Sequence, residues 1–285
     1  MKIVVNYLKE VEELFNEGKI DFIDYFKLYS LNEDLSGLEW CIQHRPVMFH
    51  GIIGKASTFG EMDLVESTDV EKTKDILMRT KTPYLSGHIC TKNKNQSKEQ
   101  TLEALSKNIK EYKKIFGKEI ALENIPYREY YNHCLYLLNP ELISKIVYDN
   151  DCIFLFDISH ARKAAMYLSM PFEEYVAKLP MDKVIEFHMA GMFEMPNGTK
   201  MDYHGKLNEE DYKFLEEAIR KYPTLQYITL EYGSYLPKEK LNLLAGINLP
   251  LADFESVNPI VKTEVYEQLT IIKDILEKAD KHTSD

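Results

Sequence analysis

The chain has 285 residues, of which 45% are hydrophobic and 28% charged, a composition typical of a globular protein with a sizeable core. Its formal net charge of −11 argues against nucleic acid or an anionic membrane as a partner, because such partners usually select a basic surface. No stretch approaches 18 uncharged apolar residues, which argues against a membrane-spanning helix.

Short apolar runs that are predicted to be β-strands alternate with amphipathic segments along the chain. Leu8–Phe15 and Lys98–Phe116 are clear helical segments, with apolar residues three and four apart, and Pro259 begins a third. Eight strand–helix units predict a single (β/α)8 TIM barrel over residues 1–280, followed by a polar tail over 281–285. The predicted strands are Ile3–Asn6, Phe22–Leu28, Val47–Ile52, Tyr84–Ile89, Ile120–Asn124, Ile153–Ile158, Val184–Met189 and Tyr227–Tyr232.

Gly191–Leu207 is the longest segment without a helical pattern between a predicted strand and its helix. Long ordered loops of this kind tend to be functional, and this one contains the pair Asp202-x-His204. We therefore expect the segment to contribute to a site.

The four cysteines, Cys41, Cys90, Cys134 and Cys152, contain no C-x-x-C pair. They fit neither a disulfide framework nor a thiolate zinc site, and they suit a reducing compartment. The first apolar run, Ile3–Val5, lacks the flanking features of a signal peptide. A cytoplasmic protein is expected.

Histidine and acidic residues stand at the ends of six predicted strands. Successive positions are separated by 38, 35, 34, 31 and 43 residues, each about one strand–helix unit. All six side chains should therefore return to the carboxyl-end rim, where the active sites of such barrels lie. Three further groups in nearby loops raise the set to nine. The nine are His50, His88, Glu123, Asp157, His160, His188, Asp202, His204 and Glu231.

Imidazoles and carboxylates together suit zinc, iron and similar divalent ions. Nine ligands exceed the needs of one ion, whereas two or three ions with a bridging carboxylate would use them all. Each residue also has an ordinary interpretation: a strand-end histidine as a hydrogen-bonded core group, Asp202-x-His204 as a turn, Glu123-Asn124 as a helix cap. Their joint periodic placement favours a multinuclear metal site.

Other polar side chains near the predicted rim are candidates for binding a substrate carboxylate or phosphate. They are Lys92, Asn124, Arg128, Arg162 and Tyr203. A surface salt bridge is an equally good interpretation of each charged one.

Several segments around these residues resemble one family: Met-Phe-His-Gly-Ile-Ile, Leu-Ser-Gly-His-Ile, Leu-Glu-Asn, Leu-Phe-Asp-Ile-Ser-His, Phe-His-Met-Ala-Gly and Asp-Tyr-His-Gly. These segments, within residues 45–235, resemble the multinuclear non-heme iron-dependent oxidative enzymes. Members of that family are xylose-isomerase-like TIM barrels that modify peptides during natural-product maturation. The resemblance implies a substrate that is a cysteine-containing peptide or small thiol, and it is compatible with a partner protein that delivers the peptide.

The resemblance also implies a distribution of ligands among two or three iron ions. His50, His88 and Glu123 would hold one ion, and Glu123 would bridge to a second. One iron would take a substrate thiolate, and the other would activate dioxygen for hydrogen abstraction beside the sulfur. The second ion would be held by Asp157, His188 and Glu231, and a third by His160, Asp202 and His204. Glu123, Asp157, His188 and Glu231 are the residues expected to be catalytic.

Two positions depart from that family. It usually has Asn where His160 stands and often a second His where Met192 stands. The Asp157-x-x-His160 spacing instead matches the endonuclease IV group, in which three zinc ions supply a hydroxide that cleaves a phosphodiester. A zinc-dependent phosphodiesterase is therefore the first alternative. A sugar isomerase or epimerase and a non-catalytic metal-binding barrel are further alternatives.

Overall fold

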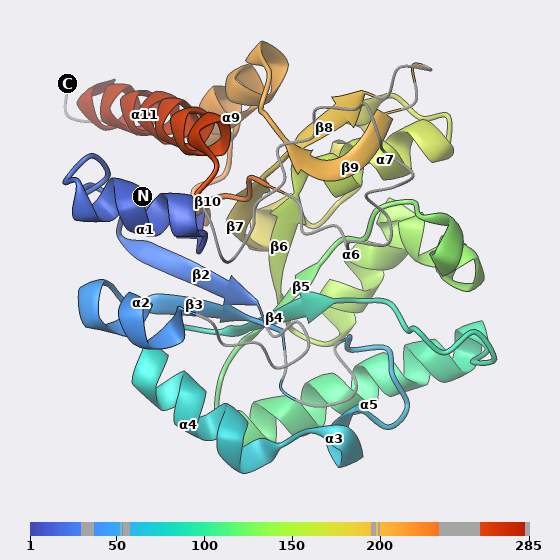
Figure 1. The fold of residues 1–285 in the computed structure, drawn as a ribbon. Helices are drawn as coiled ribbons and strands as arrows, with labels where there is room; N and C mark the ends of the chain where they lie inside the picture. The colour runs from blue at the N-terminus through green and yellow to red at the C-terminus, as the bar shows by residue number, and fades with distance from the viewer. Residues whose placement is uncertain are drawn as a thin grey trace.

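The computed structural model has eight parallel strands closed into a barrel, with helices around the outside (Figure 1). It describes residues 1–29, 37–51, 53, 58–194, 198, 200–233 and 257–282. The strands follow one another around the barrel in the order β1-β10-β7-β6-β5-β4-β3-β2, which confirms the (β/α)8 TIM barrel. They are β1 (Lys2–Asn6), β2 (Tyr25–Tyr29), β3 (Val47–His50), β4 (Leu85–His88), β5 (Ile120–Glu123), β6 (Ile153–Asp157), β7 (Val184–Met189) and β10 (Tyr227–Leu230).

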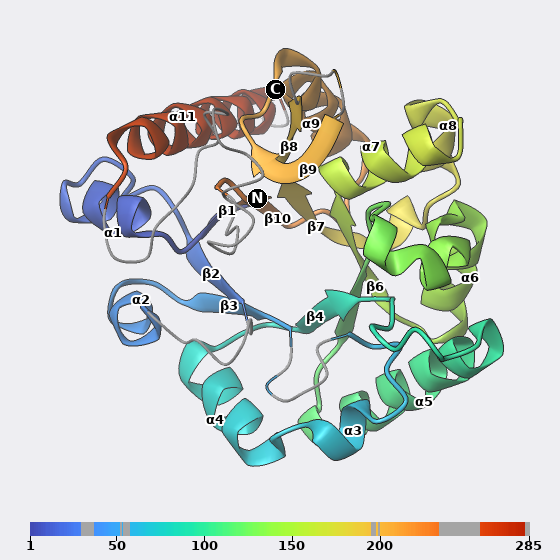
Figure 2. The same ribbon diagram turned by 45° about the vertical axis from the view of Figure 1, so that its right-hand side comes forward.

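Figure 2 shows the helices as a ring around these strands. Some begin at capping residues: Ser97 and Gln100 form a capping box at the start of α5, and Gly117 ends that helix with a φ of 60°. The α-helices are α1 (Lys9–Asn16), α2 (Leu38–His44), α3 (Leu64–Ser67), α4 (Val70–Thr80), α5 (Lys98–Phe116), α6 (Pro140–Asp149), α7 (Ile158–Tyr167), α8 (Phe172–Ala177), α9 (Glu209–Lys221) and α11 (Pro259–His282). Two 3₁₀ segments are η2 (Glu129–Leu138) and η3 (Met181–Lys183).

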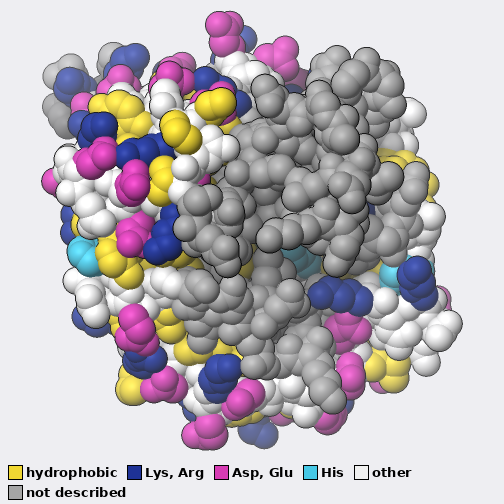
Figure 3. All heavy atoms as spheres, viewed as in Figure 1, with side chains coloured by type: hydrophobic (Ala, Val, Ile, Leu, Met, Phe, Trp, Pro, Cys, Tyr) yellow, Lys and Arg dark blue, Asp and Glu magenta, His cyan; other side chains and the backbone are white. Residues whose placement is uncertain are grey.

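Helix α11 continues to His282, so the first residues of the expected polar tail are helical, and residues 283–285 lie outside the described part. Among the described residues, no helix has the length and apolar character needed to cross a bilayer. On the face in Figure 3, acidic and basic side chains are intermixed over the described surface.

The expected strand Phe22–Leu28 began too early. The Ile23 amide donates to the Ile20 carbonyl at 3.1 Å, which makes the first part of that run a turn, and β2 starts at Tyr25. Ile23 is nevertheless buried in the core, so its apolar character reflects packing rather than extended structure. The other strands end within two residues of the predicted bounds, and position 52, the expected end of β3, lies outside the described residues.

Gly191–Leu207, expected as a long ordered loop without a helical pattern, contains an antiparallel hairpin of β8 (Gly191–Glu194) and β9 (Lys200–Gly205). Gly191 permits the close approach of its two ends, because a Cβ there would lie 2.1 Å from the Lys206 carbonyl oxygen. The hairpin lies beside α7 (Figure 1) and brings Asp202 and His204 back toward the barrel.

Candidate metal centre

All nine predicted ligands lie at the carboxyl ends of the strands or in the segments that follow them. Within each of four overlapping groups, one ligand atom per residue lies within 4.8 Å of the others. The groups are His50, His88 and Glu123; Asp157, His188 and Glu231; His160, Asp202 and His204; and Glu123, Asp157 and His160.

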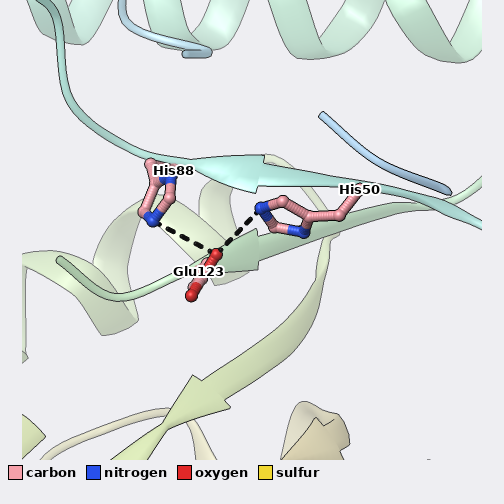
Figure 4. Close-up of side chains that lie close together, drawn as sticks. All are labelled: His50, His88 and Glu123. Atoms are coloured by element: carbon pink, nitrogen blue, oxygen red, sulfur yellow. Dashed lines mark ion pairs between the residues drawn. The ribbon is translucent and has the colours of Figure 1, made fainter. Parts of the chain in front are cut away.

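The first group comes from three neighbouring strands, β3, β4 and β5 (Figure 4). Oε2 of Glu123 lies 3.2 Å from Nε2 of His50 and 3.3 Å from Nε2 of His88. The other ring nitrogen of His50, Nδ1, lies 2.8 Å from the hydroxyl of Ser86. Ser86 thereby fixes the ring with Nε2 toward Glu123.

In the second group, the carboxylates surround one ring nitrogen of His188. Its Nδ1 lies 2.8 Å from Oε1 of Glu231, 3.3 Å from Oε1 of Glu123 and 3.9 Å from Oδ2 of Asp157. The two oxygens of Glu123 therefore face different groups: Oε2 faces His50 and His88, and Oε1 faces His188. This is the arrangement required of a carboxylate that bridges two cations.

The third group joins α7 to the hairpin. His160 Nε2 lies 3.4 Å from Oδ2 of Asp202, and its Nδ1 is held 2.8 Å from the Asn124 carbonyl. His204 stands 3.8 Å from Oε2 of Glu231, and its side chain is 27% exposed, whereas that of His160 is 5% exposed. The His204 end of this group is accordingly more open to solvent than the His160 end.

Burial and neighbouring charges shift the pKa values of the cluster. Burial, followed by the nearby carboxylates, raises the pKa of Asp157 to about 6, despite an opposing effect of His160. Burial tends to lower the pKa of His160, but Asp157 and Asp202 outweigh it and raise that pKa to about 10. Burial lowers the pKa of His88 to about 4. A bound cation would replace these competing interactions.

The described residues satisfy three tests of a metal site. Glu123 Oε2, Asp157 Oδ2 and His188 Nδ1 are buried without a hydrogen-bond partner in the described part of the chain, which is costly unless something else binds them. The spacings fit, since metal bonds of about 2.0–2.2 Å place neighbouring ligand atoms roughly 3–4 Å apart. Mixed imidazole and carboxylate donors suit first-row divalent ions.

The structure distributes the expected substrate-binding residues differently. Arg128 reaches the cluster, where its Nη2 lies 2.7 Å from Oδ2 of Asp202. Arg162 instead pairs with Asp211 on α9 at 2.8 Å and lies over the Phe172 ring.

Asn124 has both halves of its amide engaged by the backbone of Asp157, at 3.0 and 2.9 Å. Its observed contacts therefore join β5 to β6. The side chain of Tyr203 lies outside the described part of the structure. Lys92 follows β4 with an exposed side chain, and its backbone amide donates to the Glu61 carboxylate at 2.6 Å.

Several side chains that the sequence reasoning did not single out contact the ligands, among them Ser159, whose hydroxyl donates to Asp157 and Asp202. Ser86 contacts His50, the Tyr29 hydroxyl donates to Glu231, and Lys27 and Glu186 contact His188. Ser86 and Glu186 stand two residues before His88 and His188, and Lys27 stands two before Tyr29, in each case on the same face of the strand. Polar residues at those otherwise apolar interior positions were the available signal.

A family model described as the RiPP precursor modification enzyme MbnB/TglH/ChrH matches residues 11–245. This chain belongs to that family. The match confirms the family resemblance drawn from the ligand segments. RiPPs are ribosomally made peptides that enzymes modify after translation, so membership identifies an enzyme and implies a peptide substrate.

More distant similarities concern the sequence and the fold. A UPF0276 protein of Acaryochloris marina (strain MBIC 11017) is 22% identical over 207 residues, which are 67% of this chain and 71% of that protein. A xylose isomerase domain containing protein of Salmonella typhimurium LT2 has a TM-score of 0.62 at 12% identity, over 95% of this chain and 96% of the other. Endonuclease IV from Thermus thermophilus has a TM-score of 0.55 at 12% identity, over 98% and 100%. At such identities the structures establish only a shared xylose-isomerase-like TIM barrel, and they do not establish a common activity.

Proposed function

We propose that the chain is an oxidative enzyme that uses two or three iron ions to modify a cysteine-containing peptide. The observation that carries the proposal is the orientation of Glu123, whose two oxygens face His50 and His88 on one side and His188 on the other. His50, His88 and Glu123 would hold one ion. Glu123, Asp157, His188 and Glu231 would hold a second and form the catalytic group, and His160, Asp202 and His204 a third.

Iron bound there would supply redox chemistry toward dioxygen and a binding position for the sulfur of a substrate cysteine. The chain's own residues would orient the ligands and limit access to them. His188, Glu231 and Asp157 are almost fully buried, whereas His88 and His204 are partly exposed. A peptide would thus approach from the side of His88 and His204, where Arg128 is also partly exposed and suited to a substrate carboxylate.

The proposal is tested by purifying the protein without oxygen and measuring its metal content, with Mössbauer and EPR spectra of the iron. We expect at least two iron ions per chain and oxygen consumption that requires a thiol-bearing peptide. Only zinc in every preparation, with no oxygen uptake, would refute the oxidative function. A peptide-delivering partner is part of the proposal, and its addition should lower the KM for the peptide rather than create activity alone.

A zinc-dependent phosphodiesterase is the second candidate, favoured by the position of His160. This residue departs from the family pattern, and it lies in the cluster with Asp157 and Asp202. Three zinc ions there would supply a hydroxide and stabilise charge on a phosphodiester. Nicking of abasic-site DNA by the zinc-loaded protein, abolished by a chelator, would support this candidate, and intact DNA with fully loaded protein would remove it.

A further inference from the structure

A buried ion pair lies inside the barrel next to the candidate metal centre. Lys27 Nζ on β2 lies 2.6 Å from Oε1 of Glu186 on β7, and both side chains are at most 1% exposed. Strands β1 and β10 stand between β2 and β7, so the pair crosses the barrel interior. The Tyr84 hydroxyl donates to the other oxygen of Glu186 at 2.7 Å, and the Thr229 hydroxyl donates to the first.

Such a pair is unusual at this position, because barrel interiors are mostly filled by branched aliphatic side chains. It is also a weak source of stability, since removing two charges from water costs about as much as their attraction returns. The pair therefore needs an explanation other than holding the barrel together.

The imidazole of His188 provides one, because its two nitrogens face in different directions. Nδ1 lies among Glu231, Glu123 and Asp157, as described above. Nε2 contacts Lys27 Nζ and lies 3.3 Å from Oε1 of Glu186. The ring thus stands between the carboxylates of the candidate centre and the buried pair.

A ring nitrogen that binds a cation must present its lone pair, so a neutral His188 bound through Nδ1 carries its proton on Nε2. An N–H at Nε2 needs an acceptor. In the structure Lys27 Nζ, which as an ammonium ion has only donors, contacts Nε2, whereas Glu186 offers a carboxylate oxygen. Cation binding through Nδ1 would move the proton to Nε2 and replace the lysine contact by one with Glu186. Glu186 is accordingly the group that can hold the metal-binding tautomer.

We propose that Glu186 is a positioning residue for His188, and that Lys27 holds Glu186 in place for this role. The carboxylate accepts from Nε2 and turns Nδ1 toward Glu123, Asp157 and Glu231. Lys27, Tyr84 and Thr229 restrict the carboxylate to that orientation. This inference rests on the proposed metal centre and adds a group that touches neither the ions nor the substrate.

The test is a Co²⁺ titration of the cation-free protein, followed by visible absorption, with unfolding temperature measured on the same samples. Glu186→Gln keeps the shape of the side chain but weakens the acceptor. We expect it to lower Co²⁺ affinity by about 10–100-fold, the usual effect of losing such an outer partner. The d–d spectrum of the bound Co²⁺ should change as well.

A double variant separates positioning from stability. Lys27→Met alone leaves a buried carboxylate without its cation and should lower the unfolding temperature markedly. Lys27→Met/Glu186→Gln removes both charges, so we expect the unfolding temperature to recover while Co²⁺ affinity stays low. Asp211→Asn, which breaks the partly buried pair of Asp211 on α9 with Arg162 on α7, is the matched control and should affect stability without changing Co²⁺ binding.

A second measurement shows directly which ring nitrogen of His188 carries the proton. In protein labelled with ¹⁵N-histidine and loaded with Zn²⁺, His188 should be protonated at Nε2, and Glu186→Gln should reduce that preference. The positioning role would be overturned if Glu186→Gln kept the wild-type affinity and tautomer, or if the double variant recovered both affinity and stability. Either result would leave the proposed metal centre standing. Failure of the wild-type protein to bind Co²⁺ or Zn²⁺ would instead refute the metal centre.

Discussion

Oε1 of Glu123 lies 3.3 Å from Nδ1 of His188, and neither that nitrogen nor the second oxygen of Glu123 has a hydrogen-bond partner among the described residues. Glu123 on β5 and His188 on β7, separated by β6 alone, thus place buried ligand atoms where one cation could bind both.

Glu123→Gln should affect more than one ion, because Glu123 faces both the His50–His88 pair and His188. We expect metal affinity to fall by more than about 100-fold, beyond the loss caused by an outer partner. Elemental analysis after dialysis measures the effect, with the exposed Glu103→Gln as a control. Wild-type stoichiometry in Glu123→Gln would show that the residue does not bridge.

Metal removal should destabilise the folded protein, because ions that bind the native cluster but not the unfolded chain stabilise the native state by mass action. Free metal at 100 times its Kd contributes about 2.7 kcal/mol. The unfolding temperature should therefore fall by roughly 5–10 °C on adding a chelator and recover when metal is restored. An unfolding temperature unaffected by the chelator would contradict a metal-bound native state.

Metal binding at the third group should strengthen as pH rises. Asp157 and Asp202 raise the pKa of His160 to about 10 against the effect of burial, so at pH 7 this imidazole is protonated in the cation-free protein. A cation needs the neutral ring, and binding must release that proton. Affinity should increase about tenfold per pH unit for each proton released. Zn²⁺ calorimetry in buffers of different ionisation enthalpy counts the protons, and a count of zero would contradict the prediction.

Arg128 and a third cation compete for the same oxygen, because the guanidinium lies 2.7 Å from Oδ2 of Asp202. Arg128→Met should raise the affinity of the third site by about tenfold or more, the equivalent of one charge-assisted hydrogen bond. Zn²⁺ titration would detect the change, and the exposed Arg220→Met is the control. A third site that weakens in Arg128→Met would mean that the arginine supports the ion.

Gly191→Ala should disrupt the hairpin that carries Asp202 and His204. The added Cβ would lie 2.1 Å from the Lys206 carbonyl, whereas at its hairpin partner Gly205 the nearest atom would be 3.4 Å away. We expect Gly191→Ala to lose the third ion and retain barrel secondary structure by circular dichroism, while Gly205→Ala retains all ions. Equal metal content in the two variants would contradict this view of the hairpin.

The sequence alone was enough to determine the barrel and the location of the candidate site. Histidine and acidic residues recur at strand ends about once per strand–helix unit, and closing eight parallel strands necessarily collects such positions at one rim. The location of the site therefore follows from the order of the elements along the chain and from the parallel orientation of the strands, both of which can be read from the sequence.

Only the tertiary structure decided which side chains face one another. Arg128 reaches Asp202, but Arg162 lies against α9; Asn124 binds the backbone of Asp157; Lys27 meets Glu186 at a separation of 159 residues. The physical reason is that these contacts depend on barrel closure, side-chain rotamers and the return of the β8–β9 hairpin, which bring together residues far apart in the chain. Hydrophobic periodicity specifies which face of a strand is buried, but it carries no information on the partner that a buried charge will find across the barrel.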